Sequence, residues 1–268
     1  MHILLPPSEG KSFPETGPVM ELQKLSFPEL ADARHRVLEA LIEVSNRDDA
    51  AEILKVGKRV IPEVVAQRDI LNMPCAPARK VYNGVLYQAA QLRNSDDVLI
   101  FSALFGITSA DDLIPAYRLS MNTSLPGIGS LKSFWRRELA KVASISTGSD
   151  RKRHVCATSD TDETLNTTVD MRSGAYQVTT PLGQSWDLSV VDSRDKVITH
   201  AAKHYRGLLT RALLDAQQTA QPERRDTPAG TSDITASLDV AQVARTLGHI
   251  EVTHDGLHHH ITLKLGEG

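Results

Sequence analysis

Val98-Leu99-Ile100-Phe101-Ser102-Ala103-Leu104 is the clearest candidate for a buried strand, and Gly106 follows soon after it. A short apolar run that ends at a turn residue is typical of a strand covered on both faces. Residues 2–5 form a second short apolar run, which stops at Pro6-Pro7, and residues 168–171 predict a third strand. The sheet is therefore expected to contain segments from distant parts of the chain.

Helices are predicted between and after these strands. Ser26 is predicted as the N-cap of the first helix, with Pro28 in its first turn and Glu29 closing a capping box. Further helices are predicted over residues 79–93 and 200–216.

Strands and helices alternate without a strict βαβ pattern, so we expect an α/β (α+β) fold with a mixed sheet flanked by helices. A single domain is predicted over residues 1–268, ending in a hairpin over residues 250–263. Residues 217–236 are rich in Gln, Pro, Thr, Gly and Ser and predict a flexible loop.

Composition excludes several classes of protein. The net charge of −3 is wrong for a protein that coats nucleic acid with its whole surface, so any polyanion must meet a local patch. Two cysteines, Cys75 and Cys156, do not suggest a disulfide framework. Neither a signal peptide nor an apolar run of about 20 residues is visible, so we expect a cytoplasmic protein without membrane contact.

Three polar segments are candidates for a ligand site. The first is the loop after the first predicted strand, where Ser8, Gly10 and Lys11 could hold an anion although the spacing is not that of a Walker A loop. The second is Tyr117-Arg118, which suits phosphate or carboxylate recognition but fits an internal salt bridge equally well.

The third segment is one face of the 200–216 helix, at helical spacing: His200, Lys203, His204, Gly207 and Arg211. A glycine there costs about 1 kcal/mol relative to alanine, which indicates close approach of a ligand or of another backbone. The alternative is a solvated basic face in which Gly207 serves packing.

A turn at Gly57 separates two short helices predicted within residues 48–72. Lys55, Lys58 and Arg59 surround it, as in a helix-hairpin-helix element that directs backbone N–H groups and cations at DNA phosphates. Short helix–glycine–helix turns are also common in proteins that bind no DNA.

Other catalytic classes lack support in the sequence. His258-His259-His260 cannot converge on a metal if it forms a strand, because neighbouring side chains point to opposite faces. No GxSxG motif and no dinucleotide fingerprint is present. We therefore predict no metal and no cofactor.

Taken together, the motifs resemble the YaaA family of peroxide-stress proteins. The resemblance rests on segments that occur in the family's order along nearly the whole chain: residues 3–11, 82–87, 101–106, 115–121, 134–135 and 202–208. The Ser8-Glu9-Gly10-Lys11 form of the opening resembles an actinobacterial branch, since other members have Ser-Pro-Ala-Lys there.

The resemblance implies a cytosolic protein with a single YaaA-like domain that limits oxidative damage and binds duplex or branched DNA through a helix-hairpin-helix element. That element corresponds here to Lys55, Gly57, Lys58 and Arg59. The implied basic cleft is lined by Ser8, Lys11, Arg79, Tyr117, Arg118, Lys203 and Arg206. Two departures weaken the DNA interpretation: the net charge is acidic, and residues 107–112 lack the Leu-Arg-Pro turn of the family.

Two functional hypotheses follow. The first is a DNA-binding protein of the peroxide response. The second is an enzyme that acts on a small anionic molecule, such as a nucleotide or amino acid, with Lys203 as the candidate base or nucleophile. A purely structural role leaves the polar motifs unexplained.

Overall fold

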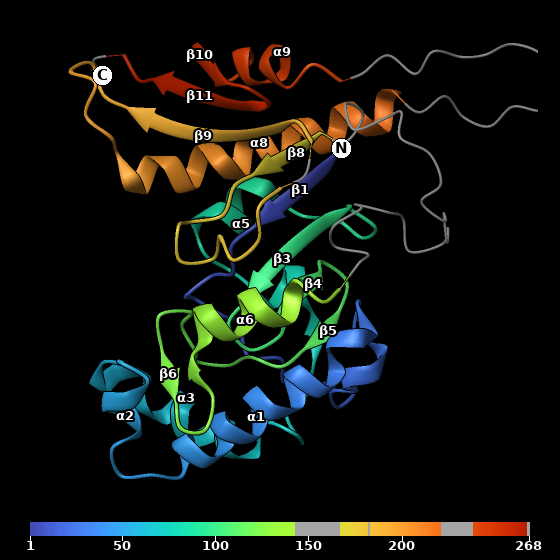
Figure 1. Cartoon of the computed structure of the whole chain (residues 1–268), viewed down its shortest axis with the longest axis vertical. Helices are drawn as coiled ribbons and strands as arrows, with labels where there is room; N and C mark the ends of the chain where they lie inside the picture. Colours follow the sequence, from blue (N-terminus) through green and yellow to red (C-terminus); the bar gives the residue numbers. More distant parts are fainter. Residues whose placement is uncertain (143–166, 182, 221–237, 267–268) are drawn as a thin grey trace, which may run out of the picture. The chain divides into compact units, whose positions relative to one another are not determined.

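The computed structural model describes residues 1–142, 167–181, 183–220 and 238–266 (Figure 1). These residues form two compact units. The first contains Met1–Gly84 and Arg93–Ser185, and the second contains Val85–Leu92 and Trp186–Gly268. The predicted flexible loop at 217–236 lies outside the described residues from position 221 onward.

The strands of the first unit confirm the three buried strands expected from the sequence. Strand β1 (His2–Leu5) pairs in parallel with both β3 (Val98–Ser102) and β8 (Thr168–Asp170), whereas β4 (Gly106–Ser109) is antiparallel to β3. The sheet is therefore mixed, as predicted. Two short antiparallel pairs accompany it: β2 (Ala76–Pro77) with β5 (Leu113–Ile114), and β6 (Ser124–Leu125) with β7 (Gly129–Ser130).

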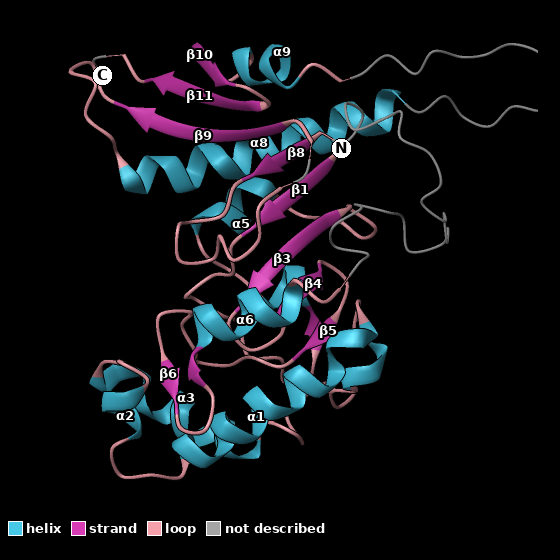
Figure 2. Ribbon diagram, in the orientation of Figure 1, coloured by secondary structure: helices cyan, strands magenta, loops and turns pink. Residues whose placement is uncertain are grey.

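The first unit also contains several short helices and one long helix (Figure 2). The α-helices are α1 (Ala31–Ser45), α2 (Ala50–Ile53), α3 (Ile61–Ala66), α4 (Ala78–Val81) and α6 (Leu131–Leu139). Short 3₁₀ turns lie at η1 (Leu22–Lys24), η2 (Pro28–Leu30), η3 (Lys58–Val60) and η4 (Gln67–Asp69).

The capping prediction at Ser26 is wrong. Phe27, in a left-handed conformation, precedes the η2 turn and makes no side-chain cap. The Ser26 hydroxyl instead donates to Asp112 at 2.6 Å, and the Ser26 N–H donates to the same carboxylate. Ser26 therefore bonds to Asp112, which is 86 residues away in the sequence, instead of capping the helix that follows it.

The turn between β3 and β4 is held from two helices. Trp135 of α6 donates its indole N–H to the Ala103 carbonyl at 2.7 Å, and Arg34 of α1 donates to the Phe105 and Ile107 carbonyls. Gly106 has φ +71°, and a Cβ there would lie 2.5 Å from the Trp135 ring. These contacts fix the end of β3, from which Ser102 faces the site described below.

The second unit contains α5 (Val85–Ala90), β9 (Ser185–Val191), α8 (Thr199–Ala220) and α9 (Val240–Arg245), followed by β10 (His249–Asp255) and β11 (His258–Lys264). The last two strands form the predicted terminal hairpin, and β11 also pairs with β9. Helix α8, orange in Figure 1, packs against α5 and α9.

The predicted continuous helix at 79–93 is wrong, because the chain leaves the helical path between Val81 and Val85. Gly207 of α8 allows α5 to pack closely against this helix. A Cβ on Gly207 would be 2.3 Å from the Leu86 carbonyl and 2.7 Å from the Ala89 Cβ. The glycine therefore permits close contact between two helix backbones, which is one of the two explanations that the sequence left open.

In the part of the chain that the structure describes, helices are too short or too polar to cross a bilayer. The mixed α/β class is confirmed. A single domain, a YaaA-like fold and a helix-hairpin-helix role for residues 48–72 stay predictions.

Candidate functional site

The loop after β1 carries the candidate site of the first unit. Pro6 and Pro7 end the strand, and the chain then turns back so that Lys11 forms an isolated antiparallel bridge with Tyr82. The Ser12 N–H donates to the Val81 carbonyl at 2.8 Å, next to this bridge. The loop is therefore attached to the segment that interrupts the predicted 79–93 helix.

Two glycines allow this close approach. A Cβ on Gly84 would lie 2.3 Å from the Ser8 hydroxyl, and a Cβ on Gly10 would lie 2.6 Å from the Asn83 side-chain oxygen. Ser8 itself is 8% exposed, and its hydroxyl has no hydrogen-bond partner among the described residues. The packing thus holds an unpaired hydroxyl beside Gly84.

Lys11 is buried in an aromatic environment. The residue is 9% exposed, and its ammonium nitrogen lies 4.4 Å from the ring centre of Tyr117 and 5.5 Å from that of Tyr82. The Nζ atom donates to the Ser8 carbonyl at 2.7 Å. No carboxylate of the described residues forms a salt bridge with it.

The pKa of Lys11 is lowered to about 7, first by desolvation and then by the positive charge of Arg118. The Glu63 and Glu9 carboxylates oppose this shift, and the two aromatic faces also favour the charged form. Burial outweighs them, because removing an unpaired ammonium from water is costly. Near neutral pH this lysine is present both as an ammonium and as a neutral amine.

The two tyrosines that face the amine belong to a row of hydroxyls. The Tyr117 hydroxyl is 2.9 Å from the Tyr82 hydroxyl and 2.8 Å from Ser102 Oγ, which also accepts the N–H groups of Leu104 and Phe105. With two N–H donors on Ser102 Oγ, its own hydrogen is available to Tyr117. Burial raises the pKa of Tyr117 well above its usual value, so this phenol stays protonated.

Arg118 is a second cation, carried by the segment between β5 and β6. Its Nε pairs with Glu63 and its Nη1 donates to the Glu9 carbonyl, while Gln67 accepts its backbone N–H at 2.8 Å. The internal salt bridge considered for this residue is thus present. The Nη2 group has no partner among the described residues and can still donate hydrogen bonds to a bound anion.

Four of the expected cleft residues lie close together, since Lys11 bonds to Ser8 and faces Tyr117, and Arg118 bonds to the Glu9 carbonyl of the same loop as Ser8 and Lys11. Arg79 is engaged elsewhere, with Asp111 at 3.2 Å and Asn94 at 3.2 Å. Tyr82, Ser102 and Glu63 were not predicted as site residues. Tyr82 and Ser102 lie within the family segments 82–87 and 101–106, which is the signal that could have identified them.

The remaining two predicted cleft residues belong to the second unit. Lys203 is exposed on α8, so the desolvation that its proposed catalytic role required is absent at that position. Arg206 is half-buried and donates from Nε and Nη2 to the Leu188 carbonyl at 3.1 and 3.0 Å.

The turn between α2 and η3 presents the residues assigned to DNA. Lys55, Gly57, Lys58 and Arg59 are all exposed, and nothing lies within 4 Å of a Cβ built on Gly57. Lys55 adopts φ +55° and its Nζ donates to the Asn122 carbonyl at 3.4 Å. This turn is accessible, but it belongs to a segment, 48–72, with five acidic and four basic side chains.

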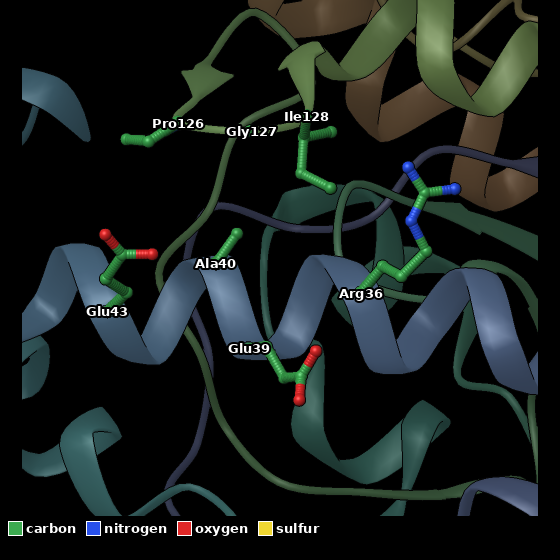
Figure 3. A pocket seen from close by; sticks show the side chains of 7 residues that line it. All are labelled: Arg36, Glu39, Ala40, Glu43, Pro126, Gly127 and Ile128. Atoms are coloured by element: carbon green, nitrogen blue, oxygen red, sulfur yellow. The ribbon is translucent and has the colours of Figure 1, made fainter.

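A shallow groove lies elsewhere in the first unit, between α1 and the β6–β7 turn (Figure 3). Its volume is about 250 Å³, and Arg36, Glu39, Glu43 and Ile128 are among its lining residues. The charges of both signs and the open shape give it no evident ligand preference.

The histidines of β11 point to alternate sides, as a strand requires. His259 stacks on Trp186 at 4.3 Å, whereas His260 pairs with Asp187 and with Ser189 Oγ at 2.9 Å. The Ser189–His260–Asp187 row has the order of a catalytic triad. However, Ser189 lies within strand β9 rather than at a turn that could direct N–H groups at an oxyanion, so we assign it a structural role.

The geometry therefore defines a mixed α/β protein in which a buried lysine faces two tyrosine rings and is influenced by the charge of an arginine. Residues 1–227 match the family model described as peroxide stress protein YaaA, and the chain belongs to that family.

Relatives span most of the chain. A UPF0246 protein of Corynebacterium efficiens is 33% identical over 98% of this chain and 99% of its own length. A UPF0246 protein of Streptomyces coelicolor is 32% identical over 80% of this chain and 83% of its own. An uncharacterized protein of Campylobacter jejuni is similar at 26% identity over 78% of this chain.

Proposed function

We propose that this member of the peroxide-stress family binds a small anionic metabolite in the cytoplasm and acts on it at Lys11. The observation that supports this proposal is the buried Lys11 amine, which lies on two tyrosine rings and forms no salt bridge with a carboxylate of the described residues. A lysine whose only role is to stabilise the fold gains little from such a position, because its charge is desolvated and only partly compensated by Glu63 and Glu9.

Arg118 and Ser8 supply the means of recognition. The Nη2 group of Arg118, which has no partner among the described residues, suits a carboxylate or phosphate oxygen, and the Ser8 hydroxyl offers a donor on the loop that carries Lys11. Lys11 is then the reactive group, since a neutral amine serves as a base or a nucleophile near pH 7.

Thermal unfolding with inorganic phosphate, AMP, aspartate and pyruvate tests this function. At least one of these anions is expected to raise the Tm of the wild-type chain, because a ligand that binds only the folded state stabilises it. Lys11→Met is expected to lose that increase, and Lys11→Arg, which keeps a cation, to retain part of it.

Lys24→Met is the matched control, since Lys24 is exposed and pairs only with Glu21. It should respond to the anion as the wild type does. A wild-type Tm that none of the four anions changes, or an increase that survives in Lys11→Met, contradicts the proposed function.

DNA binding through the turn at 55–59 is the second candidate. The observation in its favour is that Lys58, Arg59 and Gly57 are exposed together at the start of η3, where backbone N–H groups lack helical acceptors. The observation against it is that segment 48–72 contains more acidic than basic side chains, which repel the DNA phosphates.

A further inference from the structure

We infer that Lys11 is a nucleophile that forms an imine with a carbonyl compound carrying an anionic group, such as a 2-oxo acid. This inference rests on the proposed function and adds the reaction class to it. The arguments are the position of the amine, the positive charge of Arg118 that acts on it, and the row of hydroxyls that belongs to the two tyrosine rings facing it.

The amine is held so that it can attack. One N–H of Lys11 is directed to the Ser8 carbonyl, which orients the nitrogen, and the residue retains 9% exposure. The Ser8 and Glu9 carbonyls are consecutive on the loop and hold Lys11 and Arg118 respectively. Because consecutive carbonyls hold the two cations, we place the carboxylate of the ligand on Arg118 and its adjacent carbonyl carbon at the amine.

The charge pattern favours a carbonyl electrophile over a simple anion. Coordination of an anion alone requires a permanent cation, which Arg118 supplies. A second cation that is desolvated and partly neutral adds little attraction but supplies a lone pair. The hydrophobic tyrosine faces also exclude water, and exclusion of water favours the dehydration that yields an imine.

The reaction balances as amine plus carbonyl to imine plus water. The Lys11 nitrogen forms a bond to the carbonyl carbon, while the π electrons move to the oxygen, which takes a proton. The nitrogen loses one proton to give a carbinolamine, whose hydroxyl then takes a second proton and leaves as water while the nitrogen lone pair forms the C=N bond, and the nitrogen finally releases its second proton. The Ser102–Tyr117–Tyr82 hydroxyl row belongs to the two rings that face the amine, and we assign to it the delivery and recovery of these protons.

Borohydride trapping on the wild-type protein tests the inference. The chain is incubated at pH 7 with pyruvate, or separately with pyridoxal 5′-phosphate, reduced with sodium borohydride and mapped by peptide mass spectrometry. Reduction fixes the imine as a stable secondary amine. We expect adducts at Lys11 to exceed those at the exposed Lys24 and Lys80 by at least about tenfold, since ordinary lysines are almost fully protonated at pH 7.

Tyr117→Phe serves as a second probe, because it keeps the ring and removes the hydroxyl. It is expected to slow adduct formation at Lys11 about tenfold, whereas a merely structural role for the hydroxyl leaves the labelling ratio unchanged. The mapped ratio is read in the wild type, so the main test does not depend on a variant that folds.

Adducts spread evenly over exposed lysines overturn the inference. If an anion still raises the Tm through Lys11 in that case, the proposed function survives and only the imine step fails. If neither stabilisation nor labelling depends on Lys11, both fail together.

Discussion

Lys11 couples the stability of the fold to pH. The pKa of this lysine is about 10.5 in the unfolded chain, whereas in the folded protein its pKa is lowered to about 7. The groups that face it are Arg118, Glu63 and Glu9 together with the phenols of Tyr82 and Tyr117. Between these two pKa values the unfolded state binds more protons. Stability therefore rises with pH across this window, by up to about 1.4 kcal/mol per pH unit.

Urea unfolding at pH 7, 8 and 9 measures this slope. Lys11→Met removes the titrating group, so its free energy of unfolding should rise less steeply than that of the wild type over the same range. The difference between the two proteins cancels the titration of distant groups. Parallel slopes would show that Lys11 titrates in the folded state as an ordinary lysine.

The sequence favours Lys203 as the reactive lysine because it lies among cationic neighbours on one helix face, but the structure leaves this side chain exposed. Lys11 acquires its properties from Tyr82 and Tyr117, which are distant in sequence and unmarked by any local spacing. Burial of a single amine is a tertiary property, and the sequence could indicate only that the loop is polar.

At the scale of elements, periodicity predicted the strands and the long helix α8 but missed the break between α4 and α5. The apolar spacing continues through Tyr82–Gly84, so the pattern alone indicates a helix. The break arises because the Ser8–Lys11 loop bonds to this segment and needs a residue without Cβ at Gly84. A competing contact from another part of the chain thus overrides local helix propensity.

Gly207→Ala tests the close packing of α5 on α8. Alanine favours a helix over glycine by about 1 kcal/mol, but the new Cβ would meet the Leu86 backbone oxygen at 2.3 Å. Backbone cannot yield as a side chain does, so we expect a net loss of about 1–3 kcal/mol in the free energy of unfolding. Urea denaturation measures this loss.

Gly57→Ala is the matched control. Gly57 has φ −76°, and no atom lies within 4 Å of the added Cβ. This variant should be unchanged or stabilised by up to about 1 kcal/mol. Equal effects of the two substitutions would contradict the assignment of Gly207 to helix packing.

For the whole molecule, a net charge of −3 limits how DNA can be bound. The overall field repels a polyanion, and only a local cluster can offset this repulsion. Lys55, Lys58 and Arg59 are the cations that the turn exposes, so contact with about three phosphates is the most that this turn can supply.

Fluorescence anisotropy with duplex, branched and single-stranded DNA at several salt concentrations tests this limit. Each phosphate neutralised contributes a slope of about −0.9 in log K against log salt for duplex DNA, so the turn alone predicts a slope between about −2 and −3. The double variant Lys58→Glu/Arg59→Glu should abolish binding, while Lys24→Glu, which changes an exposed lysine outside the turn, should weaken it only slightly. Unaltered affinity in the double variant would retire the turn as the DNA site. A much steeper slope would mean that cations beyond residues 55–59 contact the DNA, and the search for them would then move to the exposed basic face of α8.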